Sequence, residues 1–270
     1  MKKRVLKVAA LVTAIMLIIG VCLFANSLVG NPISKALAKN TAEKYIEKTY
    51  GNTDYELEHV SYSFKDGYYH AYVSSASIMD GDFTLLINGF GKLRFDEYDR
   101  SVTNGWNTAS RLAADYRETV KTIFDSSSFP YNAHMGYGEL AFVSMENKND
   151  PYVPDYALIT EDLTLDAFYN VGELGSKAGK LTVYINDKTV SAERLAEILL
   201  GIRECFDTAD IGFQTIDCVL EYPQTEDGNY EYGRFEVMDF AYDDICEEGL
   251  VERVKASNDA ANAYYNSWNS

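Results

Sequence analysis

VSYSFKDGYYHAYV, residues 60–73, alternates apolar and polar side chains on both sides of Asp66-Gly67. Alternation with a period of two is typical of a strand with one buried face. Asp-Gly accepts the positive φ angles of a two-residue turn between antiparallel strands. The segment therefore predicts a β-hairpin. The side chains expected on its buried face are Val60, Tyr62, Phe64, Tyr69, Ala71 and Val73.

Turn signals and strand patterns continue after the hairpin. Two more turn dipeptides, Asp-Gly at 80–81 and Asn-Gly at 88–89, bracket the run FTLLIN and lead into KLRFDEY. This spacing predicts four strands in an antiparallel meander. Apolar residues recur at helical spacing on either side of the strands, at 33–50 and 108–124. We predict a domain over residues 31–128 whose sheet is covered by these helices.

A second, acidic α+β domain is predicted for residues 129–270, after a polar, proline-bearing linker that begins at Ser126. Its expected elements are a strand near 138–145, a strand at 181–185, a helix from Ser191, strands at 213–222 and 230–240 joined across Asp227-Gly228-Asn229, and a helix at 244–268. The predicted fold class is α+β: an N-terminal transmembrane helix followed by two small domains of antiparallel sheet packed against helices.

The transmembrane prediction rests on the apolar run VAALVTAIMLIIGVCLFA at residues 8–25, which follows four basic residues. As a helix this run would cover roughly 27 Å, close to the thickness of a bilayer's hydrocarbon core. Flanking basic residues are retained in the cytoplasm. We therefore expect a cytoplasmic tail and anchor over residues 1–30, with residues 31–270 outside. The expected anchor residues include Val8, Leu11, Ile15, Leu17, Ile18, Leu23 and Phe24.

Cleavage of the same segment is the alternative. Ala25 and Ser27 place small residues where a signal peptidase requires them, and the chain would then be secreted after cleavage near Ser27. The apolar run is longer than the roughly 7–15 residues of a signal-peptide core. Its length favours a retained anchor.

Charge is concentrated in the second predicted domain. Residues 129–270 hold 9 basic and 27 acidic groups, whereas residues 31–128 hold 11 and 14. Such an acidic surface repels phosphate backbones, so we predict no nucleic-acid partner. Cys205, Cys218 and Cys246 follow the apolar run. Their odd number permits one disulfide or three buried thiols.

The layout of roughly the first 125 residues resembles a known family. The residues that carry the resemblance are Asn31-Pro32, Ala38, Ala42, Tyr45, Ile46 and Asp96 to Asp99, after a basic N-terminus and an apolar run. The chain is similar in these features to the YfjL-like family of membrane-anchored proteins from Gram-positive bacteria, which have distinct N- and C-terminal domains. The resemblance implies an architecture and a location. It implies no activity, and no functional residue is carried over from it.

The sequence carries no common catalytic signature. H-E-x-x-H, C-x-x-C and G-x-S-x-G, the zinc, redox and serine-hydrolase motifs, are absent, and we predict no cofactor. GSKAGK at 175–180 imitates a phosphate-binding loop. However, Leu174 and Leu181 stand where that loop needs a glycine and a hydroxyl. This segment predicts a flexible connection.

An acidic cluster precedes the last predicted helix. It admits three interpretations: favourable charge at a helix N-terminus, a cation site, or a carboxylate pair for glycoside hydrolysis. The helix interpretation is favoured because the twelve-residue calcium loop is absent. The candidate metal ligands are Asp239, Asp243, Asp244 and Glu247.

Tyrosine is abundant, with 21 residues against 13 phenylalanines. A tyrosine ring can pack while its hydroxyl stays in water, which suits half-exposed sheets and recognition surfaces. We therefore predict a membrane-anchored, extracytoplasmic binding or interaction module without catalytic activity, whose partner is a protein or an envelope component. The alternatives are a carboxylate- or cation-dependent envelope enzyme and a regulator or inhibitor of an exported protease.

Overall fold

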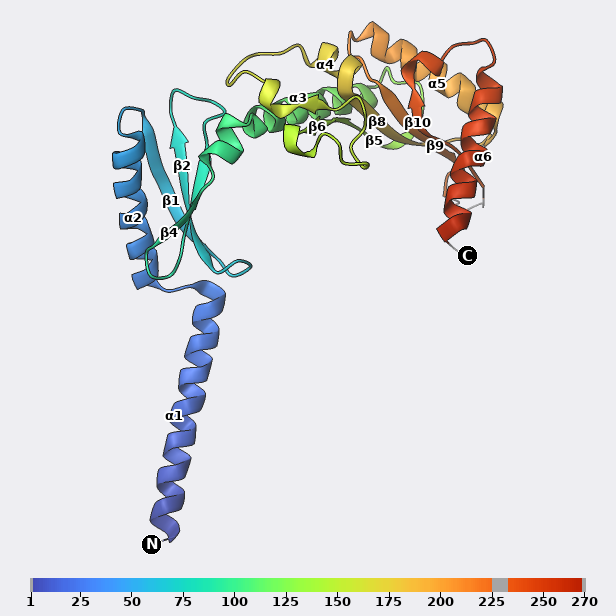
Figure 1. Cartoon of the computed structure of the whole chain (residues 1–270). Coiled ribbons are helices and arrows are strands. Elements are labelled where there is room, and N and C mark those ends of the chain that lie inside the picture. Colours follow the sequence, from blue (N-terminus) through green and yellow to red (C-terminus); the bar gives the residue numbers. More distant parts are fainter. Residues whose placement is uncertain (1, 225–232, 269–270) are drawn as a thin grey trace. The chain divides into compact units, whose positions relative to one another are not determined.

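A computed structural model describes the backbone of residues 2–224 and 233–268 (Figure 1). Within its terminal helices, the side chains outside the description are those of residues 2–6, 8–10, 22, 23, 26, 27, 266 and 268. The turn predicted at Asp227-Gly228-Asn229 also lies outside the described residues. The chain divides into an N-terminal unit, residues 1–107, and a C-terminal unit, residues 108–270.

Helix α1 covers Lys2–Val29. Of the predicted anchor residues, Leu11, Ile15, Leu17, Ile18 and Phe24 have exposed side chains on this helix, whereas Val8 and Leu23 have side chains outside the description. Nowhere in the described part of the chain is a helix both long enough and apolar enough to cross a membrane. This finding contradicts the predicted transmembrane helix and the single-pass location built on it.

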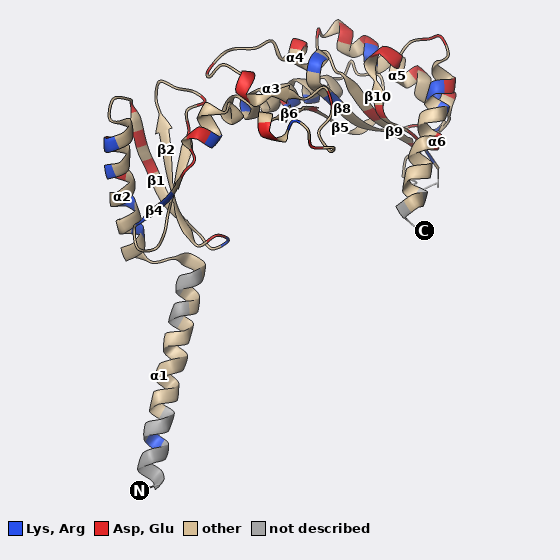
Figure 2. Ribbon diagram, in the orientation of Figure 1, with Lys and Arg blue, Asp and Glu red and all other residues tan. Residues whose placement is uncertain are grey.

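Helix α2 (Pro32–Tyr50) begins where the sequence predicts. Asn31 caps it by accepting a hydrogen bond from the Ser34 amide at 2.8 Å, and Pro32 occupies the first turn, where no amide donor is needed. The buried side chains recur every four residues, at Ser34, Ala38, Ala42 and Ile46. Lysines lie along the exposed part of the helix (Figure 2).

The N-terminal sheet is the predicted antiparallel meander. Its strands, in spatial order, are β1 (Tyr55–Ser63), β2 (Tyr68–Ser75), β3 (Phe83–Ile87) and β4 (Leu93–Asp96). Helix α2 lies against one face of this sheet (Figure 1). Val60, Ala71, Leu85 and Ile87 are among the side chains buried there.

The loop of the first hairpin is longer than predicted. Residues 64–67 connect β1 to β2, and the Gly67 amide donates to the Ser63 carbonyl at 2.8 Å. Phe64 therefore lies outside the strand with 63% of its surface exposed, so its predicted burial is wrong. The other side chains keep the predicted face: Val60, Tyr62, Tyr69, Ala71 and Val73.

The C-terminal sheet is mixed, whereas we predicted an antiparallel one. Its strands are β5 (Ala133–Leu140), β8 (Gly179–Asn186), β9 (Thr215–Glu221) and β10 (Arg234–Ala241), in the spatial order β10-β9-β8-β5. β8 and β9 run parallel. Helix α5 (Ala192–Thr208) connects them, and parallel neighbours require such a crossover because a tight turn cannot join them.

The remaining elements of the described chain are three helices, two short strands and four single turns. They are the helices α3 (Trp106–Phe124), α4 (Val171–Ala178) and α6 (Leu250–Trp268), the short parallel pair β6 (Phe142–Val143) and β7 (Leu158–Ile159), and the single turns η1 (Asp99–Thr103), η2 (Met145–Asn147), η3 (Thr160–Asp162) and η4 (Tyr242–Asp244). The last helix begins later than predicted, because η4 takes up the start of its predicted range.

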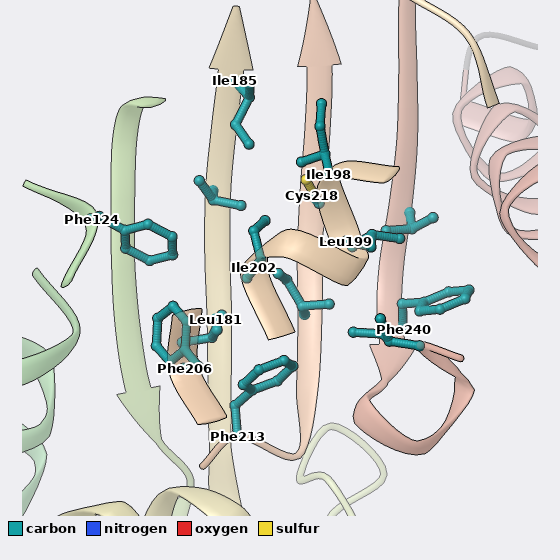
Figure 3. Close-up of a cluster of buried hydrophobic side chains, with 14 of the residues drawn as sticks. Phe124, Leu181, Ile185, Ile198, Leu199, Ile202, Phe206, Phe213, Cys218 and Phe240 are labelled. Atoms are coloured by element: carbon teal, nitrogen blue, oxygen red, sulfur yellow. The ribbon is translucent and has the colours of Figure 1, made fainter. Parts of the chain in front are cut away.

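Helix α3 belongs to the C-terminal core. Its apolar stripe, from Leu112 through Tyr116 and Val120 to Phe124, is buried in the same cluster as the residues of β8 and α5. The Phe124 ring lies 5.3 Å from that of Phe206 (Figure 3). We predicted that this helix covers the first sheet and that the domain boundary follows residue 128. The structure instead divides at 107, since the apolar side chains of α3 complete the second core.

The three cysteines of the C-terminal unit are free thiols. Cys218 is fully buried in the core (Figure 3), and burial raises the pKa of its thiol. Cys205 is half-buried and Cys246 is exposed. The structure therefore has thiols rather than a disulfide at these positions.

Candidate binding surface

The N-terminal sheet has a second face, opposite the one that α2 covers. Its residues are His59, Ser61 and Ser63 of β1, Tyr68, His70 and Tyr72 of β2, Thr84 and Leu86 of β3, and Phe95 of β4, and we call them the open face. Successive side chains of a strand point to opposite faces, so these residues alternate with the buried ones. Phe95 is 57% exposed, whereas Leu85 on the covered face is 0% exposed.

Aromatic and imidazole rings group together on the open face. The rings of His59 and Tyr72 stack with their centroids 4.4 Å apart and their planes within 14°. His70 lies 6.4 Å from Tyr72 on the same strand. Tyr68 meets Phe95 edge to face at 6.4 Å. The open face therefore presents a set of flat rings flanked by serine and threonine hydroxyls.

The sequence did not single out Tyr68, Tyr72 or Phe95 as site residues. Their signal was present, because Tyr68, His70 and Tyr72 occupy alternate positions of one strand. What the sequence could not show is the four-residue loop, which pairs Ser63 with Tyr68 and so sets His59 directly opposite Tyr72 in the stack.

Asp66, in the hairpin loop, contacts two residues of the open face, Tyr68 and His70. Its carboxylate lies 2.7 Å from the His70 ring nitrogen Nε2 and accepts a hydrogen bond from the Tyr68 amide at 3.0 Å. Partial burial alone would raise the pKa of Asp66, but the hydrogen bonds from Tyr68 and His70 outweigh it and lower this pKa.

We expect the stability of the N-terminal unit to depend on pH through Asp66. A carboxyl whose pKa is lower in the folded state binds fewer protons there than in the unfolded chain, so its contribution is present above about pH 4 and is lost as the pH falls through the folded pKa. The melting temperature of the N-terminal unit should therefore fall between about pH 5 and pH 2.5. Asp66→Asn, which keeps the shape of the side chain, should reduce this fall. An equal fall in variant and wild type would contradict the assignment.

A small acidic hollow of about 210 Å³ adjoins the ring of Tyr72. Glu58 and Asp82 contribute its carboxylates, and Thr84 and Asn107 contribute polar groups. Burial, and then the negative charge of Glu58, raise the pKa of Asp82. This end of the open face therefore carries negative charge beside an aromatic ring, an arrangement that attracts cationic groups.

Comparison with known protein families shows to which family the chain is related. Residues 3–100 match the family model of the YfjL-like N-terminal domain, and residues 115–255 match that of the YfjL-like C-terminal domain. The chain belongs to the YfjL-like family. The family predicted from roughly the first 125 residues is thereby confirmed, and the second match extends it to the C-terminal half. No curated protein and no solved structure matches it.

The structure places Asp239, a predicted metal ligand of this YfjL-like chain, in an ion-pair network. Lys180 of β8 contacts the Asp239 carboxylate at 2.5 Å and that of Asp217 at 2.9 Å. Burial lowers the pKa of Lys180, but the two carboxylates outweigh it and raise this pKa. Asp239 therefore has a lysine as its partner and ties β10 to β8 across β9.

The other predicted ligands lie between β10 and α6. Asp243 and Asp244 lie in η4, and Glu247 lies in the connection that follows. Within the described ranges, no three His, Cys, Asp or Glu side chains gather in a way that could hold a metal ion. Of the four predicted ligands, all of which lie in the described part of the chain, Asp239 is the one that pairs with Lys180.

A cavity of about 420 Å³ between the end of α5 and η4 includes Asp243 in its lining. The hydroxyl of Tyr242 donates to the Asp207 carboxylate at 2.7 Å, and the Arg203 guanidinium lies 4.3 Å from the centre of the Tyr242 ring. Arg203 also approaches Asp207 at 3.6 Å. These contacts balance the charge of Asp207 and connect α5 to η4.

Proposed function

We propose that this YfjL-like chain is a non-catalytic binding module and that the open face of its N-terminal sheet is the binding surface. The observation that carries the proposal is the stack of His59 on Tyr72, 4.4 Å apart, on the less buried side of the sheet. Flat rings give a ligand a large contact area at a small cost in side-chain entropy. The hydroxyls beside them supply hydrogen bonds that fix its orientation.

Two classes of ligand suit such a surface. A protein partner can place aromatic or aliphatic side chains against Tyr68 and Phe95, whose rings meet edge to face. A glycan can stack a sugar ring on the aromatic side chains and bond its hydroxyls to serine and threonine. Both would be held by contact and hydrogen bonding rather than by a reaction at a nucleophile.

The alternative, a carboxylate-dependent enzyme, has the acidic cavity near η4 as its candidate. Its carboxylate Asp207 is already hydrogen-bonded to Tyr242 and faces Arg203. Each oxygen of this carboxylate therefore already contacts another side chain of the protein. The binding proposal is therefore the one that the geometry supports better.

Phe95→Ser should weaken binding to the open face about tenfold, and Phe64→Ser should change it less than about twofold. The pair is matched, because Phe95 and Phe64 are 57% and 63% exposed but only Phe95 belongs to the open face. A photo-crosslinking phenylalanine analogue at position 95, with position 64 as control, captures a protein ligand in cells. A glycan panel measured with wild type and both variants tests the other class.

Two results would contradict the proposal. One is equal crosslinking at positions 95 and 64 together with no glycan binding. The other is a catalytic turnover of a captured ligand that Phe95→Ser leaves unchanged.

A further inference from the structure

A groove runs along α3 in the C-terminal unit, on the side where the end of α5 approaches it. Two adjoining cavities of about 470 and 430 Å³ form the groove, and they share Thr122, Ile123 and Ala209 in their lining. Along α3 the lining extends from Asp115 to Ile123, which is about 12 Å of helix, or roughly two turns. The groove therefore has the length of a short helical segment.

The floor of this groove is apolar and accessible. Ile123 of α3, Cys205 of α5 and Ile211 after α5 are each half-buried rather than buried. Phe129, which is buried, also contributes to the lining, together with Ser126 and Ser128 of the polar loop. Apolar side chains of a ligand would bury the remaining exposed surface of these residues, which is the main source of affinity in such grooves.

The rim of the groove is acidic. Asp115, Glu118 and Glu204 line it with exposed side chains. Asp115 pairs with Arg111 at 3.8 Å, whereas the other cations of α3, Arg117 and Lys121, pair with Glu139 and Asp125. Glu118 and Glu204 have no ion pair among the described residues, so their charge is available to a ligand.

The C-terminal unit as a whole is acidic, like the rim of the groove. Residues 108–270 hold 12 basic and 30 acidic residues, a net charge of −18, whereas residues 1–107 hold 12 and 11. An acidic field of this size speeds the approach of cationic partners and repels anionic ones. Charge complementarity therefore selects a basic ligand.

We propose that the groove binds a short amphipathic helix of a partner protein, with apolar side chains on one face and lysine or arginine beside them. Apolar side chains spaced three and four residues apart would rest on Ile123, Cys205 and Ile211. The flanking cations would meet Glu118 and Glu204 on the rim. This surface is separate from the open face of the N-terminal sheet, and the two can be tested independently.

The test uses the full chain and three synthetic peptides: a Leu/Lys amphipathic helix, the same helix with Glu in place of Lys, and a scrambled Leu/Lys peptide. We expect only the first to bind well and to slow the alkylation of Cys205 by iodoacetamide, read by mass spectrometry. Exposed Cys246 is the internal control, and its alkylation rate should not change. Because burial and Glu204 raise the pKa of the Cys205 thiol, the reaction is best run at mildly alkaline pH.

Matched variants separate the groove from general charge attraction. Glu118→Gln with Glu204→Gln should raise the Kd threefold to tenfold, by roughly the range of exposed ion pairs, and Ile123→Ser should raise it roughly tenfold. Glu146→Gln with Glu252→Gln removes the same charge from exposed residues that do not line the groove, and should change the Kd less than twofold. Equal binding of the scrambled peptide, unslowed alkylation of Cys205, or an equal effect of both double variants would overturn the proposal.

Discussion

Tyr116→Ala is expected to lower the free energy of unfolding of the C-terminal unit by about 3–5 kcal/mol, the range of large aromatic truncations in cores. Tyr116 of α3 is 0% exposed. Its hydroxyl donates a hydrogen bond of 2.9 Å to the carbonyl of Gly212. The variant therefore loses a buried ring and also leaves a carbonyl without its partner, and both losses act in the same direction.

The Tyr116 variant also tests which core α3 belongs to. Hydrogen exchange should show faster opening of the β8 amides and unchanged protection of β3 in the N-terminal unit. Tyr116→Phe, which keeps the ring, should cost only about 1–2 kcal/mol, and Arg117→Ala, at an exposed neighbour, should cost less than about 0.5 kcal/mol. A loss of protection in β3 instead of β8 would show that α3 covers the first sheet.

Gly175→Ala is expected to destabilise the same unit by about 2–3 kcal/mol. A methyl group at Gly175 of α4 would lie 2.1 Å from the Gly212 carbonyl oxygen and 2.6 Å from the Tyr116 ring. Overpacking of this kind costs about 1–3 kcal/mol and occasionally more. Alanine regains up to about 1 kcal/mol of helix propensity, but the clash is with backbone and a buried ring, so it outweighs the gain.

A glycine with room around it provides the control. At Gly89 the nearest atom to an added methyl group would be the Ser34 hydroxyl oxygen, at an ordinary 3.6 Å. Gly89→Ala should therefore change the melting temperature of its unit little. Thermal unfolding followed by circular dichroism compares the two variants. A harmless Gly175→Ala would mean that α4 lies farther from Tyr116 than the structure shows.

Close packing also accounts for the glycines of the segment that imitates a phosphate loop. Gly175 ends up inside α4, and Gly179 starts β8. A methyl group at Gly179 would lie 2.5 Å from the Tyr116 hydroxyl. These glycines therefore permit close packing around a tyrosine. The flexible connection predicted for 175–180 is in fact the end of a helix and the start of a strand.

The first hairpin shows which features of the candidate binding surface can be predicted from the sequence. Alternation in VSYSFKDGYYHAYV placed Val60 and Ala71 on the buried face, and both are buried there in the structure. The predicted loop was too short by two residues, because the Gly67 amide bonds the Ser63 carbonyl and Ser63 pairs with Tyr68. The stack of His59 on Tyr72 follows from that register and so was not foreseeable.

In the acidic half, the ion-pair partner of Asp239 could not be predicted from the sequence either. Its neighbours in sequence suggested a cation site or a helix start, yet its partner Lys180 lies 59 residues away in the chain. Only the order β10-β9-β8 brings the two together. Ion pairs across a sheet depend on which strands are neighbours, and the charge pattern along the chain does not specify the order of the strands.

The N-terminal meander and the capped start of α2 could be predicted because they depend on contacts between residues close in the chain, which turn dipeptides, periodicity and capping residues specify. The acidity of the second half follows from composition. The packing of α3 in the second core, the parallel pairing of β8 and β9, and the side chains that meet on the open face and in the groove could be seen only in the folded chain. These features depend on burial of apolar surface between distant segments, for which an amphipathic helix is equally suited to either sheet.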